Sequence, residues 1–293
     1  MSTKPSTDSA DFTDPRNLRN LRTFFASLLL VTAVVAALLP VYWLATISLK
    51  QPVDQFAVPP VWIGFTPTLE HFREILFARP FLTYVWNSVV VAGGSTLLAL
   101  LLGAPAAYGL ARFRLPHELH ERLSFWILST RMFPPIISIV PLFLVMNRLD
   151  LLNTRASLVL IYTAFNLPLV VWMMRGFFEE VPVELEEAAM VDGLNRVQAL
   201  VRVVLPLTAP GLAATAVFCL IVAWNEFLFA LVLTQTDRVM TLPVGIAAQV
   251  TQFEIRWGAM SAAGVLAMIP ILIFAFAVQR YLVRGLSMGA VKG

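Results

Sequence analysis

Six long apolar segments constrain the fold of this chain more than any other feature. A transmembrane helix needs about 20 mainly apolar residues to cross the hydrocarbon core of a bilayer. Only 13% of the 293 residues are charged, whereas soluble domains hold roughly 25%. The sequence therefore predicts an all-α integral membrane protein with six transmembrane helices. The segments are residues 24–49, 81–110, 123–146, 156–174, 211–233 and 259–283.

Basic residues are distributed unequally between the two sides of these spans. If the N-terminus is cytoplasmic, thirteen Lys and Arg residues lie on the cytoplasmic side and seven on the other side, while Arg131 lies within a span. Because cytoplasmic loops carry the excess of basic residues, we expect both termini to be cytoplasmic. Residues 1–22 then form an N-terminal tail, 23–284 the membrane domain and 285–293 a C-terminal tail. The external segment 50–80 is rich in proline, and we expect irregular chain with one short helix there.

The sequence lacks the residue sets that several classes of catalytic and binding site need. Cys219 is the single cysteine and lies in an apolar run, and the three histidines have no Glu or Cys at ligand spacing. Neither a phosphate-binding glycine loop nor a nucleophile with its base is present. The basic residues occur in ones and twos, which argues against nucleic acid. We expect no catalytic residue, no metal site and no cofactor bound by this chain.

The loop between the fourth and fifth spans, residues 175–210, is the longest polar interruption of the apolar pattern. Pro182 can begin a first helix and Gly193 can end it in a left-handed conformation. Asn195 and Gln198 have the spacing of a capping box for a second helix, which we expect to end before Pro206. The pattern predicts two short helices joined at Gly193.

The charge of this loop favours a protein partner over a lipid surface. Residues 175–206 hold six acidic and three basic side chains, so anionic lipid repels them. Spacings of i, i+3, i+4 and i+7 place four residues on one face of the first helix, and the small alanines among them permit close approach to a partner. These residues are Leu185, Ala188, Ala189 and Asp192.

Several motifs resemble a known family of transport proteins. Glu187-Ala188-Ala189, Gly193, Leu205 and Pro206 match the EAA signature E-A-A-x3-G-x9-I-x-L-P, with Val203 in place of isoleucine. "WNEFLFAL" at 224–231 and the tail "GLSMGAVKG" at 285–293 also match. The chain thus resembles the MalG-like permease subunits of binding-protein-dependent ABC importers of sugars, and the resemblance covers nearly its whole length.

The resemblance implies a role for the loop and for the tail. Residues 184–192 become the coupling helix that docks on a cytoplasmic ATPase, with contributions from Glu187, Ala188, Ala189, Asp192, Gly193, Leu205 and Pro206. Tail contacts to the ATPases fall to Gly289, Ala290, Val291, Lys292 and Gly293. The implied partners are a MalF-like second permease, two MalK-like ATPase subunits that bind ATP and Mg²⁺, and an extracytoplasmic solute-binding protein. The implied location is a bacterial-type plasma (inner) membrane.

Polar residues within the spans are candidates for the translocation path, because buried polar groups in a bilayer are costly and usually face an interior. For Asn225 and Glu226, the sequence supports a role in the path and a role in interhelical hydrogen bonds equally. Trp224 can stack on a sugar or simply pack. Arg131 can snorkel to the surface, form a gate or pair with Glu226. The path candidates are Asn87, Trp224, Asn225 and Glu226, and Asn166 is a further polar residue in the fourth span.

Three prolines interrupt the third span. Pro134, Pro135 and Pro141 predict a bent third span that lines a cavity.

A self-contained secondary transporter is the alternative function. It needs a buried ion-coupling carboxylate, and Glu226 is the only central acid that could provide one. The solute can be maltose, trehalose, a polyol or a glycerol phosphate, and the sequence does not choose among them.

Overall fold

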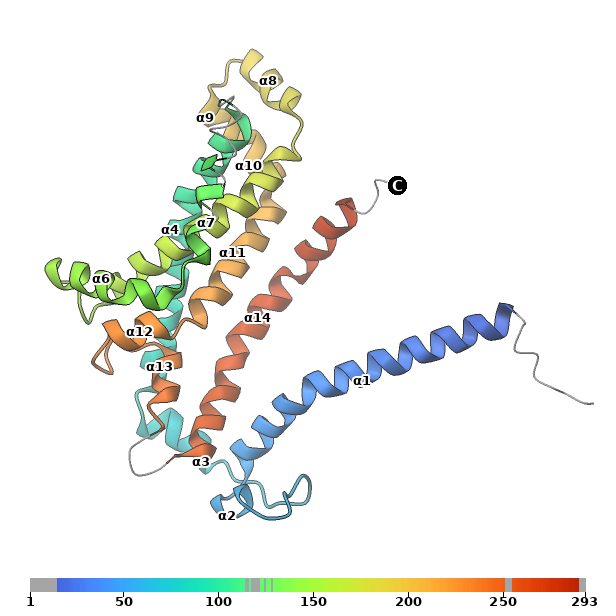
Figure 1. Ribbon diagram of the computed structural model, residues 1–293, viewed down its shortest axis with the longest axis vertical. Helices are drawn as coiled ribbons and strands as arrows, with labels where there is room; N and C mark the ends of the chain where they lie inside the picture. Colours follow the sequence, from blue (N-terminus) through green and yellow to red (C-terminus); the bar gives the residue numbers. More distant parts are fainter. Residues whose placement is uncertain are drawn as a thin grey trace, which may run out of the picture.

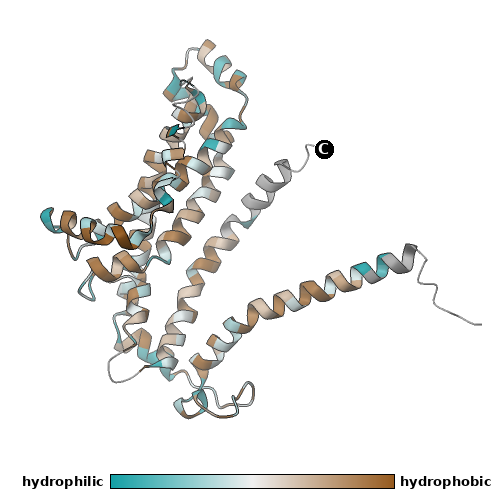
Figure 2. Cartoon of the chain, viewed as in Figure 1, coloured by the Kyte–Doolittle hydropathy of each residue, from teal (hydrophilic) through white to brown (hydrophobic). Residues whose placement is uncertain are grey.

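The computed structural model describes residues 15–113, 116, 122–123, 125–127, 129–250 and 255–289, and almost all regular structure within them is helical. Four described helices are long and apolar enough to cross a membrane. Figure 2 shows mainly hydrophobic residues along these helices and a larger share of hydrophilic residues on the short helices at one end. The four helices are α1 (Pro15–Leu49), α4 (Phe81–Arg112), α7 (Arg155–Glu179) and α14 (Trp257–Gly289).

The remaining spans are broken. The chain axis turns by 94° between Phe125–Met132 and α6 (Pro135–Arg148), at Pro134 and Pro135. The expectation of a break at Pro141 is wrong, because Pro141 lies inside α6. Helix α11 (Ala209–Trp224) stops at Trp224, and α12 (Leu228–Leu233) follows after a short break. The prediction of one continuous helix over 211–233 is therefore wrong. Another bend, of 80°, separates Arg196–Leu207 from α11, and the described residues provide up to six spans if each bent pair counts as one.

The segment before α4 contains more helix than the sequence indicated. Helix α2 (Pro52–Gln55) begins at a proline in its first turn, and α3 (Glu70–Arg73) continues directly into a π-helical turn, η1 (Glu74–Ala78). The expectation of one short helix here is wrong, since there are two separate helical stretches. Helix α13 (Leu242–Ala247) packs against α4 and α14 and shares a core cluster with Ile75 of η1.

Helices α4 and α7 form the most extensive pair in the structure, and both run toward the end at which α8 (Val183–Val191) lies (Figure 1). A stripe of small residues on α4 recurs every four positions and is buried. Small residues let two backbones approach closely, which is how helices associate in a bilayer. The stripe consists of Ser95, Ala99, Gly103 and Ala107.

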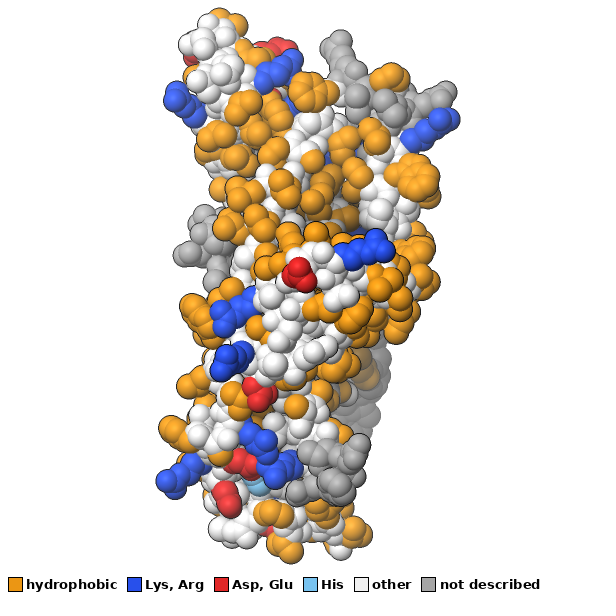
Figure 3. All heavy atoms as spheres, turned by 90° about the vertical axis from the view of Figure 1, so that its left-hand side faces the viewer, with side chains coloured by type: hydrophobic (Ala, Val, Ile, Leu, Met, Phe, Trp, Pro, Cys, Tyr) orange, Lys and Arg blue, Asp and Glu red, His pale blue; other side chains and the backbone are white. Residues whose placement is uncertain are grey.

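Helix α14 lies beside α11, and α1 contacts α14 while the rest of α1 extends away from the bundle (Figure 1). Large apolar side chains of α1 such as Leu29 are exposed within this chain, with 72% of the Leu29 surface accessible. Figure 3 shows hydrophobic side chains over much of the face that includes α6 and α12, with acidic and basic groups at its upper end, at mid-height and in its lower half. An apolar surface of this kind is the one a membrane protein presents to lipid or to a partner helix.

We predict that Gly103→Ala destabilises the α4–α7 pair. A Cβ atom at Gly103 would lie 2.6 Å from Val170 Cγ1 and 2.9 Å from Val170 Cβ, so the helices must separate. Overpacking of this kind costs about 1–3 kcal/mol. Gly93→Ala is the matched control, because nothing lies within 4 Å of its added Cβ. Denaturation of the purified protein in detergent should show lower stability only for Gly103→Ala, and equal stability would contradict close packing.

Candidate functional site

We call residues 180–208 the α8 loop. Within it, a tight hydrogen-bonded turn ends α8. Gly193 N–H donates to the Met190 carbonyl and Leu194 N–H to the Ala189 carbonyl, each at 3.1 Å. This is a Schellman motif, which requires a residue with positive φ after the helix. Gly193 meets that requirement with φ 94°. The prediction that Pro182 precedes the first helix and Gly193 ends it is confirmed.

The second helical stretch begins with the predicted capping box. Asn195 Oδ1 accepts from Gln198 N–H at 2.9 Å, and Gln198 Oε1 accepts from Asn195 N–H at 3.0 Å. Helix α9 (Arg196–Ala199) then runs into the π-helical turn η3 (Leu200–Val204) and α10 (Leu205–Leu207). The expectation that this helix ends before Pro206 is wrong, because the wider π turn accommodates a proline that donates no hydrogen bond.

A buried ion pair holds α8 on the end of α4. The carboxylate of Glu186 lies 2.5 Å from Arg112 Nε, and it also accepts from the Tyr108 hydroxyl at 2.7 Å. Arg112 Nη2 donates to the Val181 carbonyl at 2.7 Å. The Arg112 and Glu186 side chains are 6% and 4% exposed. Because this guanidinium and this carboxylate are each paired and hydrogen-bonded, the burial of both charges is compensated.

Sequence reasoning missed this pair. Glu186 is one of several acids in the first turns of α8. The one signal that distinguishes it is its i, i+3 spacing from Ala189, which places the two residues on one helix face. Glu186 and Ala189 are both buried, at 3% and 8% exposure. Nothing in the sequence connects Glu186 with Arg112, which lies 74 positions earlier.

Apolar packing beneath the loop adds to the ion pair. Phe178 and Val204 are fully buried, and Val181 and Leu200 are 8% exposed. The Phe178 ring meets Tyr108 edge to face, with 5.9 Å between ring centroids. These residues belong to one core cluster with α4, α7 and α11. The α8 loop is therefore packed onto three membrane helices and does not lie free on a surface.

The outward surface of α8 differs in one position from the predicted partner face. Ala189 turns inward beside Glu186, whereas Leu185, Ala188 and Asp192 are exposed, so the prediction is wrong for Ala189. Glu187 is exposed, and Val191 is 87% exposed. We call Leu185, Glu187, Ala188, Val191 and Asp192 the outer face of α8.

The other residues of the expected coupling set differ in exposure. Leu205 is half-buried, Pro206 is exposed, and Gly193 is exposed at the turn. Gly289 is the last residue of α14. The expected tail contacts Ala290, Val291, Lys292 and Gly293 lie outside the described residues.

Asn87 and Trp224 both have their contacts within the chain: Asn87 is hydrogen-bonded and Trp224 is buried. The Asn87 amide nitrogen donates to the Arg238 and Met240 carbonyls, and its oxygen accepts from Arg155 Nε at 2.7 Å. Trp224 is 2% exposed and meets Phe274 edge to face. Neither side chain lines the cavities described below, so both hold helices together.

Asn225 and Glu226 lie where α11 breaks. Asn225 is exposed, and its side chain donates back to the Ile221 carbonyl. The Glu226 carboxylate accepts from the Tyr162 hydroxyl on α7 and from the backbone N–H groups of Phe229 and Ala230, at 2.9 and 3.3 Å. Glu226 therefore caps the N-terminus of α12, where a carboxylate interacts favourably with the helix dipole. Its hydrogen bond with Tyr162 also connects the break to α7.

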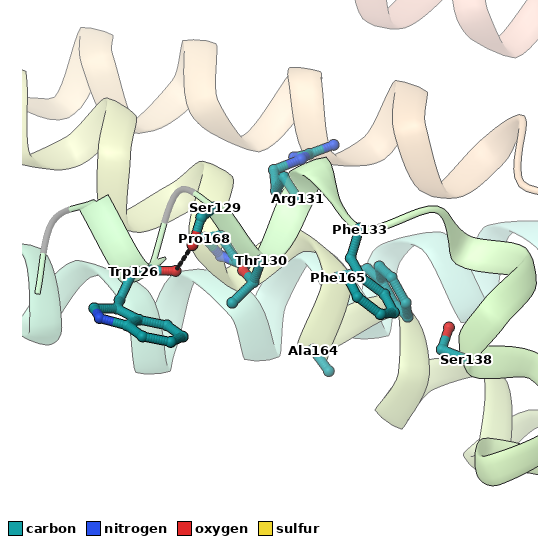
Figure 4. Close-up of a pocket in the computed structure, with 9 residues that line it drawn as sticks. All are labelled: Trp126, Ser129, Thr130, Arg131, Phe133, Ser138, Ala164, Phe165 and Pro168. Atoms are coloured by element: carbon teal, nitrogen blue, oxygen red, sulfur yellow. Dashed lines mark hydrogen bonds between the residues drawn. The ribbon is translucent and has the colours of Figure 1, made fainter.

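A cavity of about 410 Å³ opens where span three bends, as the prolines predicted. It lies between the 3₁₀ turn η2 (Thr130–Met132), the start of α6 and the middle of α7. In Figure 4 the Arg131 side chain points away from Trp126 and Ala164. The remaining lining is aromatic or hydroxyl-bearing, apart from Ala164 and Pro168. The lining residues are Trp126, Ser129, Thr130, Arg131, Phe133, Ser138, Ala164, Phe165 and Pro168.

Comparisons with known proteins assign this membrane bundle, with its broken spans and its packed α8 loop, to a class of solute permease subunits. Residues 99–288 match the model of the family described as "Binding-protein-dependent transport system inner membrane component". The chain belongs to this family, and its predicted assignment as a permease of an ABC transporter is confirmed. The ATPase activity belongs to separate subunits, and the chain is not itself an enzyme.

Individual relatives match almost end to end. The chain is similar to the sulfoquinovosyl glycerol transport system permease protein SmoH of Agrobacterium fabrum, with 37% identity over 93% of this chain and 94% of the relative. It is 36% identical to the trehalose/maltose transport system permease protein MalG of Thermococcus litoralis, over 91% of this chain and 96% of the relative. A solved bacterial ABC transporter involved in import of the acidic polysaccharide alginate has the same fold, with a TM-score of 0.74, 23% identity and coverage of 96% and 99% of the two chains.

We predict that Glu186→Gln loosens the α8 loop. The change leaves the buried Arg112 guanidinium without its counter-charge, which costs about 3–5 kcal/mol. Glu179→Gln is the control, because Glu179 pairs with Arg175 at an exposed site, where a pair contributes roughly 0–1 kcal/mol. The double variant Arg112→Met/Glu186→Leu should be more stable than Glu186→Gln. Denaturation and limited proteolysis of the loop measure this, and equal effects of Glu186→Gln and Glu179→Gln would contradict it.

Proposed function

We propose that this chain forms half of the translocation path of an ATP-driven importer for a sugar or sugar-like solute, and that α8 is its coupling helix. The relatives named for trehalose/maltose and for sulfoquinovosyl glycerol support a carbohydrate substrate. The secondary-transporter alternative loses its support, because Glu226, the central acid it needs, caps α12. An ATP-driven permease needs no ion-coupling carboxylate of its own.

The observation that carries the proposal is the buried Arg112–Glu186 pair beneath the outer face of α8. Since Arg112 also binds the Val181 carbonyl, a displacement of α8 moves the end of α4 with it. Phe178 and Val204 pass the same displacement to α7 and α11 by packing. Closure of two ATPases against such loops then changes the tilt of the spans that line the path.

The assembly that follows contains this chain, a second permease, two ATPase subunits and a solute-binding protein. ATP and Mg²⁺ are bound by the ATPase subunits. We place the α8 loop and both termini in the cytoplasm of a bacterial-type inner membrane, in line with the excess of basic residues on that side. The tail from Gly289 to Gly293 then reaches the ATPases as well.

We predict that cysteines on the outer face of α8 crosslink to an ATPase subunit. After Cys219, which is buried, is replaced by Ala, Ala188→Cys and Val191→Cys should be trapped by a short bifunctional reagent. Ala189→Cys is the matched control on the buried side and should not react. Co-purification of the second permease and the ATPases shows that the complex is whole. A whole complex without crosslinks at residues 188 and 191 would refute the coupling role.

We predict that Gly193→Val uncouples ATP hydrolysis from uptake. A β-branched residue at φ 94° is strained, at a cost on the order of 1–3 kcal/mol, so the angle between α8 and α9 must change. Solute imported per ATP hydrolysed should fall by roughly fivefold or more. Gly193→Asn is the milder comparison, because Asn tolerates positive φ better. Reconstituted vesicles give both rates, and wild-type coupling in Gly193→Val would contradict the prediction.

A further inference from the structure

Two cavities at the bend of span three share Arg131 and Phe165. The first is the cavity of about 410 Å³ shown in Figure 4. The second, of about 200 Å³, lies between η2, α7 and the break after α11, and Tyr162, Asn166 and Glu226 contribute to its lining. Phe165 itself is held against Phe229, with 4.9 Å between ring centroids. The two cavities therefore meet at one cation and one fixed aromatic ring.

The charges around these cavities are not balanced among the described residues. Within that part of the chain Arg131 makes no hydrogen bond or ion pair. Glu226 lines the second cavity, but its carboxylate is already bonded to Tyr162 and to two N–H groups of α12. Arg131 is exposed within this chain, so its guanidinium donors are available to a ligand in the cavities. The cavities thus contain one positive charge that the described residues leave uncompensated.

A buried amide adds a second observation that points to a ligand. Asn166 is 1% exposed and lines the second cavity. Its nitrogen donates to the Cys219 carbonyl at 3.4 Å, whereas its Oδ1 atom has no hydrogen-bond partner. An unsatisfied buried acceptor is rare and costs about 1–3 kcal/mol. A hydroxyl group that enters the cavity can donate to this oxygen.

We propose that Arg131, Asn166 and Phe165 form a contact site for a carbohydrate that carries a negative charge, such as a carboxylate, sulfonate or phosphate group. The guanidinium of Arg131 receives the anionic group, since its fork of N–H donors fits an oxyanion. A sugar hydroxyl donates to Asn166 Oδ1, and the apolar face of the sugar lies on Phe165. The inference rests on the proposed import function and names the class of solute.

A neutral sugar does not account for the site as well. Its hydroxyl groups can satisfy Asn166, but they cannot form the stronger, charge-assisted hydrogen bonds that a guanidinium forms with an oxyanion. An anionic solute uses both Arg131 and Asn166. An acid of the second permease and a lipid headgroup are the other sources of negative charge, and the experiments below separate them.

The first experiment identifies the charge of the solute. The solute-binding protein is purified from the native host, and the bound solute is identified by mass spectrometry. If none is retained, thermal shifts are measured with the matched pairs methyl β-D-glucuronide and methyl β-D-glucoside, and galacturonate and galactose. An anionic solute, or selection of the acidic members, supports the proposal. A neutral solute, selection of the neutral members, or no binding of any acidic member overturns it.

The second experiment measures ATP-driven uptake of that solute by the complete importer in vesicles. Arg131→Gln should lower kcat/KM for uptake by roughly 10- to 100-fold, and Arg131→Lys should retain part of the activity. Arg148→Gln is the control, because Arg148 is exposed in the last turn of α6 and lines neither cavity. Asn166→Ala should weaken uptake without changing the dependence on solute charge.

The outcomes separate the two proposals. If wild-type vesicles show no ATP-driven uptake although the complex is whole, the import function fails. If uptake proceeds but Arg131→Gln matches Arg148→Gln, only the anionic site fails. Loss of complex assembly in Arg131→Gln and Arg131→Lys would assign Arg131 to an acid of the second permease and overturn the site. An Arg131→Gln effect that disappears in vesicles without anionic lipid would assign it to a headgroup, with the same consequence.

Discussion

The burial of one ion pair, Arg112 with Glu186, is the interaction on which the α8 loop depends. Helices of nine residues or fewer are marginal in water by themselves. Helix α8 has nine residues and α9 has four. The Schellman turn and the capping box define where these helices end and begin, but neither attaches them to the membrane helices. Arg112 provides that attachment by binding Glu186 and the Val181 carbonyl together.

Within the membrane helices, polar residues divide into two groups according to whether their hydrogen bonds are satisfied. Asn87 and Glu226 have partners on other elements, so they join helices and hold a break in a defined shape. Arg131 and Asn166 Oδ1 lie at cavities and lack partners among the described residues. The first group explains how a broken bundle stays folded, and the second supplies the contacts of the proposed solute site.

The two regions are connected through α4, α7 and α11. The small-residue stripe of α4 permits close contact with α7, whose middle lines both cavities and whose end carries Phe178 under the loop. Motion of the loop therefore acts on the same helices that shape the cavities. In the proposed assembly, this continuity connects an ATPase on the outer face of α8 with the two cavities.

The sequence by itself determined the apolar spans, the bend at Pro134 and Pro135, and the limits of α8, because span length, missing proline N–H groups and positive φ at glycine are local properties. It also contained the family motif. Only the tertiary structure decided that Glu186 and Ala189 face inward, that α11 stops at Trp224, and that Asn87 is hydrogen-bonded to Arg155 and to two carbonyls. These outcomes depend on partners 64 to 153 positions away, and no local pattern records which distant side chain satisfies a buried polar group.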